Sequence, residues 1–271
     1  MADFFRFENR TTIKATLRME TALSVGSRTS FLPAGSDLPV MKTPEGIPYI
    51  PGSSLKGVVR AYTERLLRTM DTLEKKYQGQ RVWACDPLDT KKCCVPGDIK
   101  KKLFQEAKEV DAEFTSLLYK ESCTACRLFG SPWLASRVAF QDAFLQNASE
   151  MLRLTEIRDG VGIDRDLGTA KTNVKYDFET VPAGACFGIT IVVENATGWE
   201  VGLLLLALEA MRKGELPLGG KTTRGVGWGK LEEITVQRIE ESDILLYLAG
   251  QKEPETLDPK DLIGQFTGAL R

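Results

Sequence analysis

Hydrophobic and polar residues alternate along several short stretches of the chain, which is the spacing of a half-buried β-strand. The clearest case is residues 11–20, where Ile13, Ala15, Leu17 and Met19 alternate with polar or charged neighbours. Less regular versions of the pattern predict further strands over residues 137–142, about 152–158, 174–178, 187–193 and 230–238.

Three other stretches carry apolar residues at helical spacing. The first covers about residues 53–68, with Ser53 or Ser54 as its predicted N-cap, because a hydroxyl can accept from the free amides of the first turn. The second runs from about 98 to 120. The third covers about 198–213, follows a capping Thr197, and is apolar almost all round, which predicts a buried helix.

Without its insertions, the predicted order is strand, helix, strand, strand, helix, strand. This βαββαβ order is that of a ferredoxin-like α+β fold, in which two helices cover one face of an antiparallel sheet. We divide the chain into four segments. Residues 1–70 form the first half of the core, 71–130 a Cys-rich insertion, 131–240 the second half of the core and 241–271 an acidic C-terminal tail.

Composition excludes several classes of protein. The chain has 271 residues, a net charge of −1 and no histidine, which excludes histidine-dependent triads, bases and metal sites. Residues 232–271 hold nine acidic and four basic side chains, which leaves a mildly basic body. The longest apolar run, 201–208, is too short to cross a bilayer, and the N-terminus does not resemble a signal peptide. We therefore expect a cytoplasmic protein without a membrane partner.

Five of the six cysteines lie in the predicted insertion. Cys123 and Cys126 have the spacing with which two thiolates bind one Zn²⁺, and Cys85 with Cys94 would complete a tetrahedral site. Cys93 is the alternative to Cys94 as a ligand. Free thiols and a redox pair are the competing interpretations, although the βαβ context of a thioredoxin-like motif is missing. We expect a structural zinc site.

Two segments combine basic side chains with backbone amides in the manner of phosphate-binding sites. Lys56 and Arg60 share one face near the start of the first predicted helix. The Gly-rich loop 219–229 carries Lys221 and Arg224, but it is not a Walker A motif, since Glu215 stands where that motif needs glycine. A solvated helix face and a tight connector are the structural alternatives.

Five short motifs occur in series between residues 12 and 237. In chain order they are Leu23-Ser-Val-Gly26; Gly35-Ser-Asp37-Leu-Pro-Val; Pro48-Tyr-Ile-Pro-Gly-Ser-Ser-Leu-Lys-Gly57; Cys126-Arg-Leu-Phe-Gly-Ser131 with Ala135-Ser-Arg-Val; and Gly162-Ile-Asp-Arg-Asp-Leu-Gly-Thr-Ala-Lys171, followed by the Gly-rich loop. Together they resemble the RAMP superfamily, specifically the repeated backbone subunit of type III CRISPR interference complexes. The Cys-rich insertion departs from that pattern.

The resemblance implies an RRM-like core that polymerises along a guide RNA (crRNA) with neighbouring backbone subunits and other Cas subunits. A β-hairpin thumb within residues 155–185 would kink the guide and expose a single-stranded target RNA. Asp37 matches the family's catalytic aspartate, which cuts the target with Mg²⁺ or another divalent cation. The residues expected to contact RNA are Gly26, Ser54, Lys56, Arg60, Arg158, Arg165, Lys171, Lys221 and Arg224.

Three functions remain open at this point. We expect an endoribonuclease subunit that cleaves bound target RNA through Asp37. The alternative is an architectural subunit that binds the guide RNA without cutting. A guide-processing endonuclease is less favoured, because such RAMP enzymes typically use histidine or tyrosine bases and histidine is absent. Asp37 is the only acid between Glu20 and Glu45, so the sequence shows no paired carboxylate near it.

Overall fold

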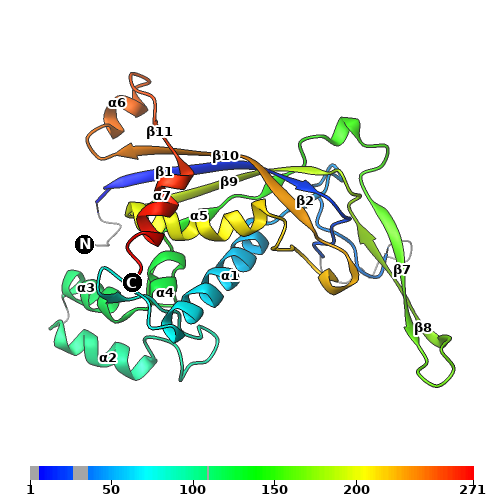
Figure 1. Cartoon of the computed structure of the whole chain (residues 1–271), viewed down its shortest axis with the longest axis horizontal. Helices are drawn as coiled ribbons and strands as arrows, with labels where there is room; N and C mark the ends of the chain where they lie inside the picture. Colours follow the sequence, from blue (N-terminus) through cyan, green and yellow to red (C-terminus); the bar gives the residue numbers. More distant parts are fainter. Residues whose placement is uncertain (1–5, 27–35, 109) are drawn as a thin grey trace.

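A five-stranded antiparallel sheet forms the centre of the computed structural model, which describes residues 6–26, 36–108 and 110–271. Figure 1 shows the sheet running along the long axis of the molecule. The strand order is β11-β10-β1-β9-β5, and the strands are β11 (Glu255–Leu257), β10 (Gly229–Glu240), β1 (Asn9–Met19), β9 (Cys186–Glu194) and β5 (Val138–Phe140).

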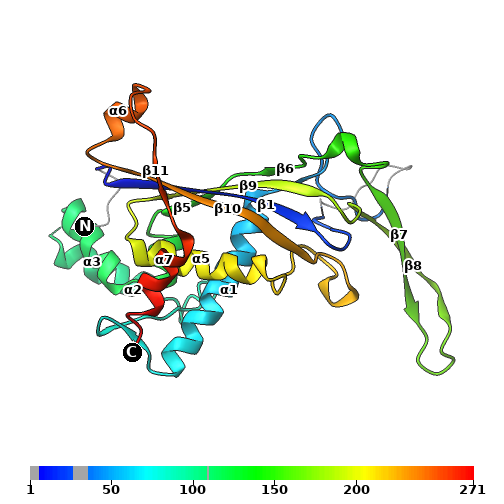
Figure 2. The same cartoon turned by 45° about the horizontal axis from the view of Figure 1, so that its top comes forward.

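Helices α1 (Gly52–Thr72), α5 (Gly198–Arg212) and α7 (Pro259–Thr267) all lie on the same face of this sheet (Figures 1 and 2). In chain order the core elements are β1, α1, β5, β9, α5 and β10, which is the predicted sequence of strands and helices. The predicted mixed α+β fold with a central antiparallel sheet is therefore confirmed.

The buried face of the sheet follows the predicted alternation. Ile13 and Leu17 of β1 and Ile191 of β9 are buried, and they belong to one apolar cluster with Leu204 and Leu208 of α5. Burying a side chain of this size contributes roughly 1.5–3 kcal/mol. A shift of β1 by one residue would expose its whole apolar set, so this packing fixes the register of the strand.

A buried ion pair joins the residue that precedes β5 to the first turn of α5. Nη1 of Arg137 donates to both carboxylate oxygens of Glu200 at 3.1 Å, and both side chains are almost fully buried. The same carboxylate accepts from the backbone amide and the hydroxyl of Thr197, at 2.9 and 2.8 Å, so Thr197 caps α5 as predicted. The guanidinium of Arg137 also lies over the ring of Tyr119, which belongs to the insertion.

The helix predicted over residues 98–120 is two helices, α2 (Gly97–Glu106) and α3 (Asp111–Glu121), so the prediction of one helix was wrong. The turn between them includes Lys108, whose φ of 50° ends the first helix. Apolar spacing continues across the turn because both helices face one small cluster, to which Leu103 and Leu118 belong.

Residues 241–271, predicted as an acidic C-terminal tail, pack in part against the core. β11 extends the central sheet, and α7 buries Leu262 and Phe266 against the body of the protein. α5 and α7 are so close that a Cβ at Gly202 would lie 2.1 Å from the Leu262 carbonyl oxygen. The sequence gives little sign of this packing, because the segment is rich in acidic residues and α7 buries only two large apolar side chains, four positions apart.

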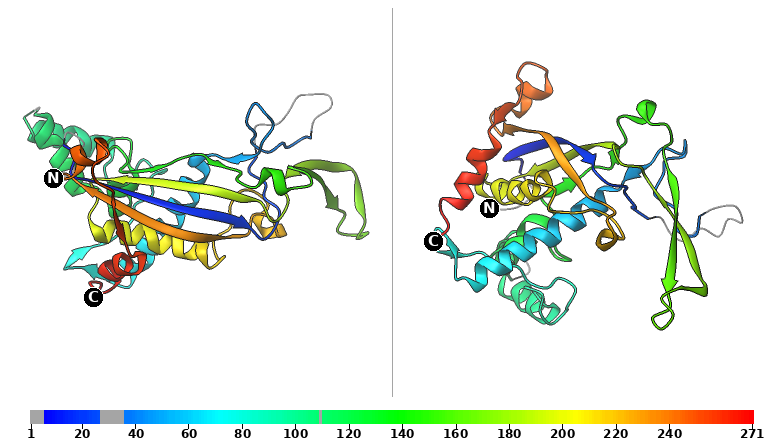
Figure 3. Two further views of the ribbon diagram at one scale, coloured as in Figure 1. Left: turned by 90° about the horizontal axis from the view of Figure 1, so that it is seen from above. Right: turned by 45° about the vertical axis from the view of Figure 1, so that its right-hand side comes forward.

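A two-stranded hairpin, which we call the thumb, projects beyond one end of the sheet (Figures 1 and 3). It consists of β7 (Glu156–Ile163) and β8 (Ala170–Thr180) and lies within the range predicted for a thumb. The remaining elements are short: β2 (Tyr49–Ile50), which pairs with β6 (Ala143–Phe144); β3 (Lys76–Tyr77), which pairs with β4 (Gln80–Arg81); α4 (Thr124–Phe129); α6 (Ile244–Leu248); and the 3₁₀ turns η1 (Ala148–Glu150) and η2 (Thr222–Arg224).

Within the described ranges, no helix combines the length and apolar character that crossing a bilayer requires.

We predict that Glu200→Ala lowers the free energy of unfolding by about 3–5 kcal/mol, because it leaves the buried Arg137 without its counter-charge. Chemical denaturation measures this change. Glu194→Ala is the matched control, since its ion pair with Arg10 is far more exposed, and we expect a loss of at most about 1 kcal/mol. Equal losses in the two variants would contradict a special role for the buried pair.

Candidate functional site

The segment that carries Asp37 lies along strand β8 at the base of the thumb. Leu38 and Phe178 form a parallel bridge, and the amide of Glu179 donates to the Leu38 carbonyl oxygen at 3.0 Å. Residues 27–35 precede this segment and are outside the described residues, so the motif with Asp37 is described only from Ser36 onward. The position of Asp37 is thus defined by its pairing with the thumb.

Asp37 and Asp177 are joined by reciprocal hydrogen bonds. The Asp37 amide donates to Oδ1 of Asp177 at 2.7 Å, and the Asp177 amide donates to Oδ2 of Asp37 at 3.1 Å. The hydroxyl of Ser36 donates to the same Oδ1 of Asp177 at 3.0 Å. The side chain of Asp37 is exposed and that of Asp177 is half-buried, so two carboxylates from distant parts of the chain lie together at the surface.

Glu179 provides a second anchor for the same segment, two residues further along β8. Its Oε2 accepts from the Val40 amide at 3.1 Å, and its Oε1 accepts from Nζ of Lys42 at 2.5 Å. Burial alone would raise the pKa of Glu179, but hydrogen bonds from Lys42, Thr155 and Val40 lower it overall. The stabilisation is therefore present above the ordinary pKa of a glutamate and is lost as pH falls through the lowered value.

The Gly-rich loop contacts the aromatic side chains that alternate with these acids along β8. Nζ of Lys221 lies 4.2 Å from the centre of the Phe178 ring, and Nη1 of Arg224 donates to the Tyr176 hydroxyl at 3.2 Å. The Gly220 amide donates to the Ser24 carbonyl oxygen at 2.8 Å, and the Gly227 amide donates to the Ala22 carbonyl oxygen at 2.7 Å. Those two amides therefore bind the protein itself, whereas we had expected the loop's amides to approach phosphates.

A cavity of ≈ 620 Å³ lies between the thumb and this loop. Arg158, Arg165 and Arg224, three of the residues predicted to bind RNA, line it together with Tyr176. Gly160 allows the tyrosine to lie across the hairpin, because a Cβ at that position would come within 2.3 Å of Cζ of the ring. The result is a basic groove with one aromatic wall.

Other residues predicted to bind RNA lie outside that groove's lining. Lys171 is exposed on β8, and Gly26 forms a bridge with Val40 beside the Asp37 segment. Ser54 is half-buried in the first turn of α1. Contacts of these residues with RNA stay a prediction.

The start of α1 is already occupied by a carboxylate of the protein. The predicted serine cap was wrong: Pro51 stands at the N-cap position, and no side chain there caps the helix. Instead, Oδ1 of Asp142 accepts from the Gly52 amide at 2.7 Å. The sequence could not show this, since Asp142 lies 90 residues away along the chain.

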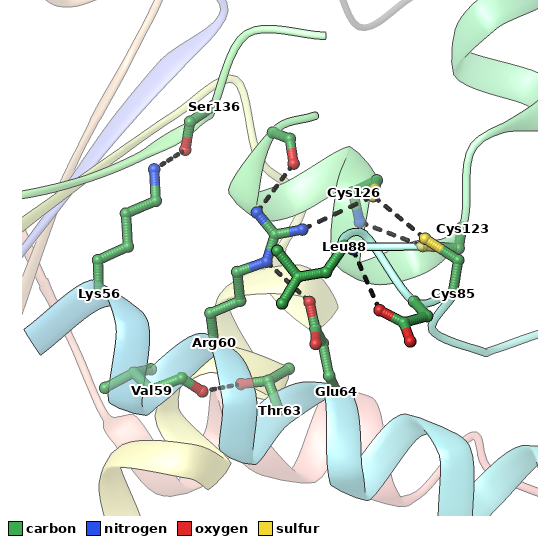
Figure 4. A network of polar contacts seen from close by, with 12 residues as sticks. Lys56, Val59, Arg60, Thr63, Glu64, Cys85, Leu88, Cys123, Cys126 and Ser136 are labelled. Atoms are coloured by element: carbon green, nitrogen blue, oxygen red, sulfur yellow. Dashed lines mark hydrogen bonds and ion pairs between the residues drawn. The ribbon is translucent and has the colours of Figure 1, made fainter. Parts of the chain in front are cut away.

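Lys56 and Arg60 donate to protein groups (Figure 4). Nζ of Lys56 donates to the hydroxyl of Ser136 at 2.7 Å and to the Val138 carbonyl oxygen at 3.3 Å, and burial lowers its pKa. Arg60 donates to Glu64 at 2.7 Å and to the Gly130 carbonyl oxygen at 3.1 Å. A phosphate at this helix would have to displace these partners.

Four cysteines of the insertion meet beside α1, close to Arg60. The sulfur atoms of Cys85, Cys94, Cys123 and Cys126 all lie within 4.8 Å of one another, and Cys93 is outside this group. The sulfur atoms of Cys85 and Cys126 are 3.7 Å apart. A tetrahedral site with Zn–S bonds of about 2.3 Å has an S···S edge of about 3.8 Å, so the described spacing fits a single metal ion.

Hydrogen bonds between the thiols of this cluster shift their pKa values in opposite directions. The hydrogen bond between Cys126 and Cys123 raises the pKa of Cys126 and lowers the pKa of Cys123 to about 7. Nη2 of Arg60 lies 3.8 Å from the Cys126 sulfur atom, which adds a positive charge beside the cluster. A metal ion would displace the remaining thiol protons, so its affinity should fall as pH falls.

The fold and these two sites agree with a known class of protein. The family model of the RAMP superfamily matches residues 16–232, and the chain belongs to that superfamily. The chain is 31% identical over 245 residues to a protein of Streptococcus thermophilus named "CRISPR system Cms endoribonuclease Csm3", covering 83% of this chain and 88% of the relative. A relative of the same name from Methanothermobacter thermautotrophicus is 28% identical over 238 residues, with 84% of each chain covered.

Proposed function

We propose that this chain is a guide-RNA-binding backbone subunit of a type III CRISPR effector complex and that it cleaves bound target RNA through Asp37. The two relatives named as Csm3 endoribonucleases support the assignment over most of the chain. We also infer a ferredoxin-like core from its βαββαβ order and its strand order. The observation that carries the proposal is the exposed carboxylate of Asp37 at the base of a hairpin that also lines a basic groove.

In this proposal the guide RNA passes through the groove between the thumb and the Gly-rich loop. Arg158, Arg165 and Arg224 neutralise phosphates there, since phosphate contacts supply most of the affinity for RNA. The ring of Tyr176 offers a flat surface on which an unstacked base can lie. The thumb bends the guide at this point, and the paired target strand is exposed to Asp37.

RNA supplies its own nucleophile, the 2′-hydroxyl beside the scissile phosphate. Asp37 accepts the proton of this hydroxyl in our proposal, a role that typically contributes about 10²–10⁴-fold. The 2′-oxygen then bonds to phosphorus, the bond from phosphorus to the 5′-oxygen breaks, and the departing 5′-oxygen takes a proton from water. Alignment contributes as well, because the hydroxyl and the leaving oxygen are out of line until the RNA backbone bends. The exposed carboxylate of Asp37 is also a ligand of the kind that Mg²⁺ prefers, and a cation held there would neutralise charge at the phosphate.

One observation favours an architectural subunit instead. Oδ2 of Asp37 accepts a hydrogen bond from the Asp177 amide, so Asp37 also stabilises the pairing of its own segment with the thumb. A residue with only this role would be needed for structure and not for cutting. The two functions differ in what the loss of the carboxylate does to cleavage.

We predict that Asp37→Ala in the assembled complex slows target cleavage by at least about 100-fold, with the affinities for guide and target RNA unchanged. Removal of divalent cations with EDTA should have a similar effect on the wild type. Asp166→Ala is the matched control, an exposed acid near the tip of the thumb, and should cut normally. Normal cleavage by Asp37→Ala would favour the architectural subunit, and specific cutting of repeat RNA by the isolated chain would favour guide processing.

We predict that Arg224→Ala weakens guide binding and reduces the slope of log K against log salt by about 1, because one phosphate contact is lost. Equilibrium binding at several salt concentrations measures the slope. Lys101→Ala, which removes an exposed charge from α2, is the control and should leave the slope unchanged. The same slope in both variants would argue against a phosphate contact at Arg224.

We further propose that the four-cysteine cluster holds one structural Zn²⁺, with Cys85, Cys94, Cys123 and Cys126 as its ligands. Structural zinc contributes roughly 10–16 kcal/mol in small domains, so the ion would hold the insertion against α1.

We predict that metal analysis finds about one zinc per chain and that Cys94→Ser lowers this content, because it removes one of four ligands. Cys93→Ser is the matched control, since the Cys93 sulfur donates to the Thr90 carbonyl oxygen and lies outside the cluster. If Cys93→Ser lost zinc and Cys94→Ser kept it, Cys93 would be the ligand in place of Cys94. Absence of zinc from the wild type would remove the proposal.

A further inference from the structure

The carboxylate of Asp177 fixes the backbone on both sides of the Asp37 Cα. Its Oδ1 accepts from the Asp37 amide at 2.7 Å and from the Ser36 hydroxyl at 3.0 Å. The Ser36 hydroxyl oxygen in turn accepts from the Leu38 amide at 3.4 Å. Three consecutive residues are thus connected to one oxygen atom of a residue in the thumb.

The same strand contacts the basic groove through its other side chains. Tyr176 and Phe178, on either side of Asp177, contact Arg224 and Lys221 of the Gly-rich loop. Successive side chains of a strand point to opposite faces. Strand β8 therefore presents aromatic rings to the groove and carboxylates to the segment with Asp37, so one strand connects the two regions.

We propose that Asp177 is a positioning residue for target cleavage, which holds the Asp37 carboxylate at a fixed place relative to the thumb. The proposal rests on the proposed function, in which Asp37 is the reacting carboxylate. Asp177 acts through its hydrogen bonds to the backbone and hydroxyl of this segment. What it must supply is an acceptor oxygen, and its charge is not required.

This distinction makes the proposal testable with two substitutions at one position. Asp177→Ala removes the acceptor, and we expect single-turnover cleavage in the assembled complex to slow by about 100-fold, the typical cost of misplacing a reacting group by about 1 Å. Asp177→Asn keeps an acceptor oxygen in nearly the same shape, and we expect cleavage within about threefold of the wild type. The affinities for guide and target RNA should be unchanged in both variants.

Ser36→Ala serves as an intermediate case, because it removes one of the two donors to Oδ1 and leaves the Asp37 amide in place. We expect a loss smaller than that of Asp177→Ala. Asp37→Ala combined with Asp177→Ala should be no slower than Asp37→Ala alone, since a positioning residue has nothing left to position.

Several results would overturn the inference. Equal losses in Asp177→Asn and Asp177→Ala would show that the charge is needed, and Asp177 would then react or bind a cation itself. Full cleavage by Asp177→Ala, or a loss explained by weaker RNA binding, would also overturn it. Cleavage that persists in Asp37→Ala removes the proposed function, whereas an inactive Asp37→Ala beside an active Asp177→Ala removes only the positioning role.

Discussion

The pairing of residues 36–40 with strand β8 determines where this protein places its candidate chemistry. Asp37 lies outside the central sheet and its side chain is exposed, so its position depends on the hydrogen bonds that its segment makes with β8. Two acids of the thumb strand, Asp177 and Glu179, supply the acceptors, and the amide of Glu179 adds a backbone hydrogen bond. The thumb is therefore part of the candidate site.

The contact between residues 36–40 and β8 adds little to the stability of the fold, but it fixes the position of Asp37. A hydrogen bond to a charged group contributes about 1.5–3 kcal/mol, and less where solvent competes. The stability of the fold depends instead on the apolar contact of the sheet with α5 and on the buried pair of Arg137 and Glu200. The protein thus separates the interactions that keep it folded from those that position Asp37. Substitutions at Asp177 can change the site without unfolding the core.

Features with a local signature were predictable from sequence. Alternation along residues 11–20 and 187–193 gave the central strands, and the spacing of Cys123 and Cys126 located half of the cysteine cluster. The βαββαβ order followed, because each element is defined by its own periodicity. The adjacent pair Cys93 and Cys94 was ambiguous in the sequence, and the structure brings Cys94 to the cluster.

Features that depend on side chains meeting across the fold were not predictable. Asp177 binds Asp37 although the two lie 140 residues apart in the sequence. Asp142 binds the Gly52 amide at the start of α1 in place of the expected serine cap, although those two residues lie 90 apart. Lys56 and Arg60 have the spacing of a phosphate site, yet their partners are Ser136 and Glu64. The one available signal for Asp177 was its place between Tyr176 and Phe178, since a residue between two aromatic neighbours in a strand faces the opposite side.

The central claim concerns where Asp37 lies relative to bound RNA, and a structure of the assembled complex tests it most directly. The complex would hold guide RNA and a target that carries a 2′-deoxy substitution at the cut position, which removes the nucleophile and keeps the strand intact. Our account predicts the Asp37 carboxylate within direct or water-mediated hydrogen-bonding reach of that sugar, at the base of the thumb. A target strand that passes elsewhere, with Asp37 in contact only with β8, would contradict it.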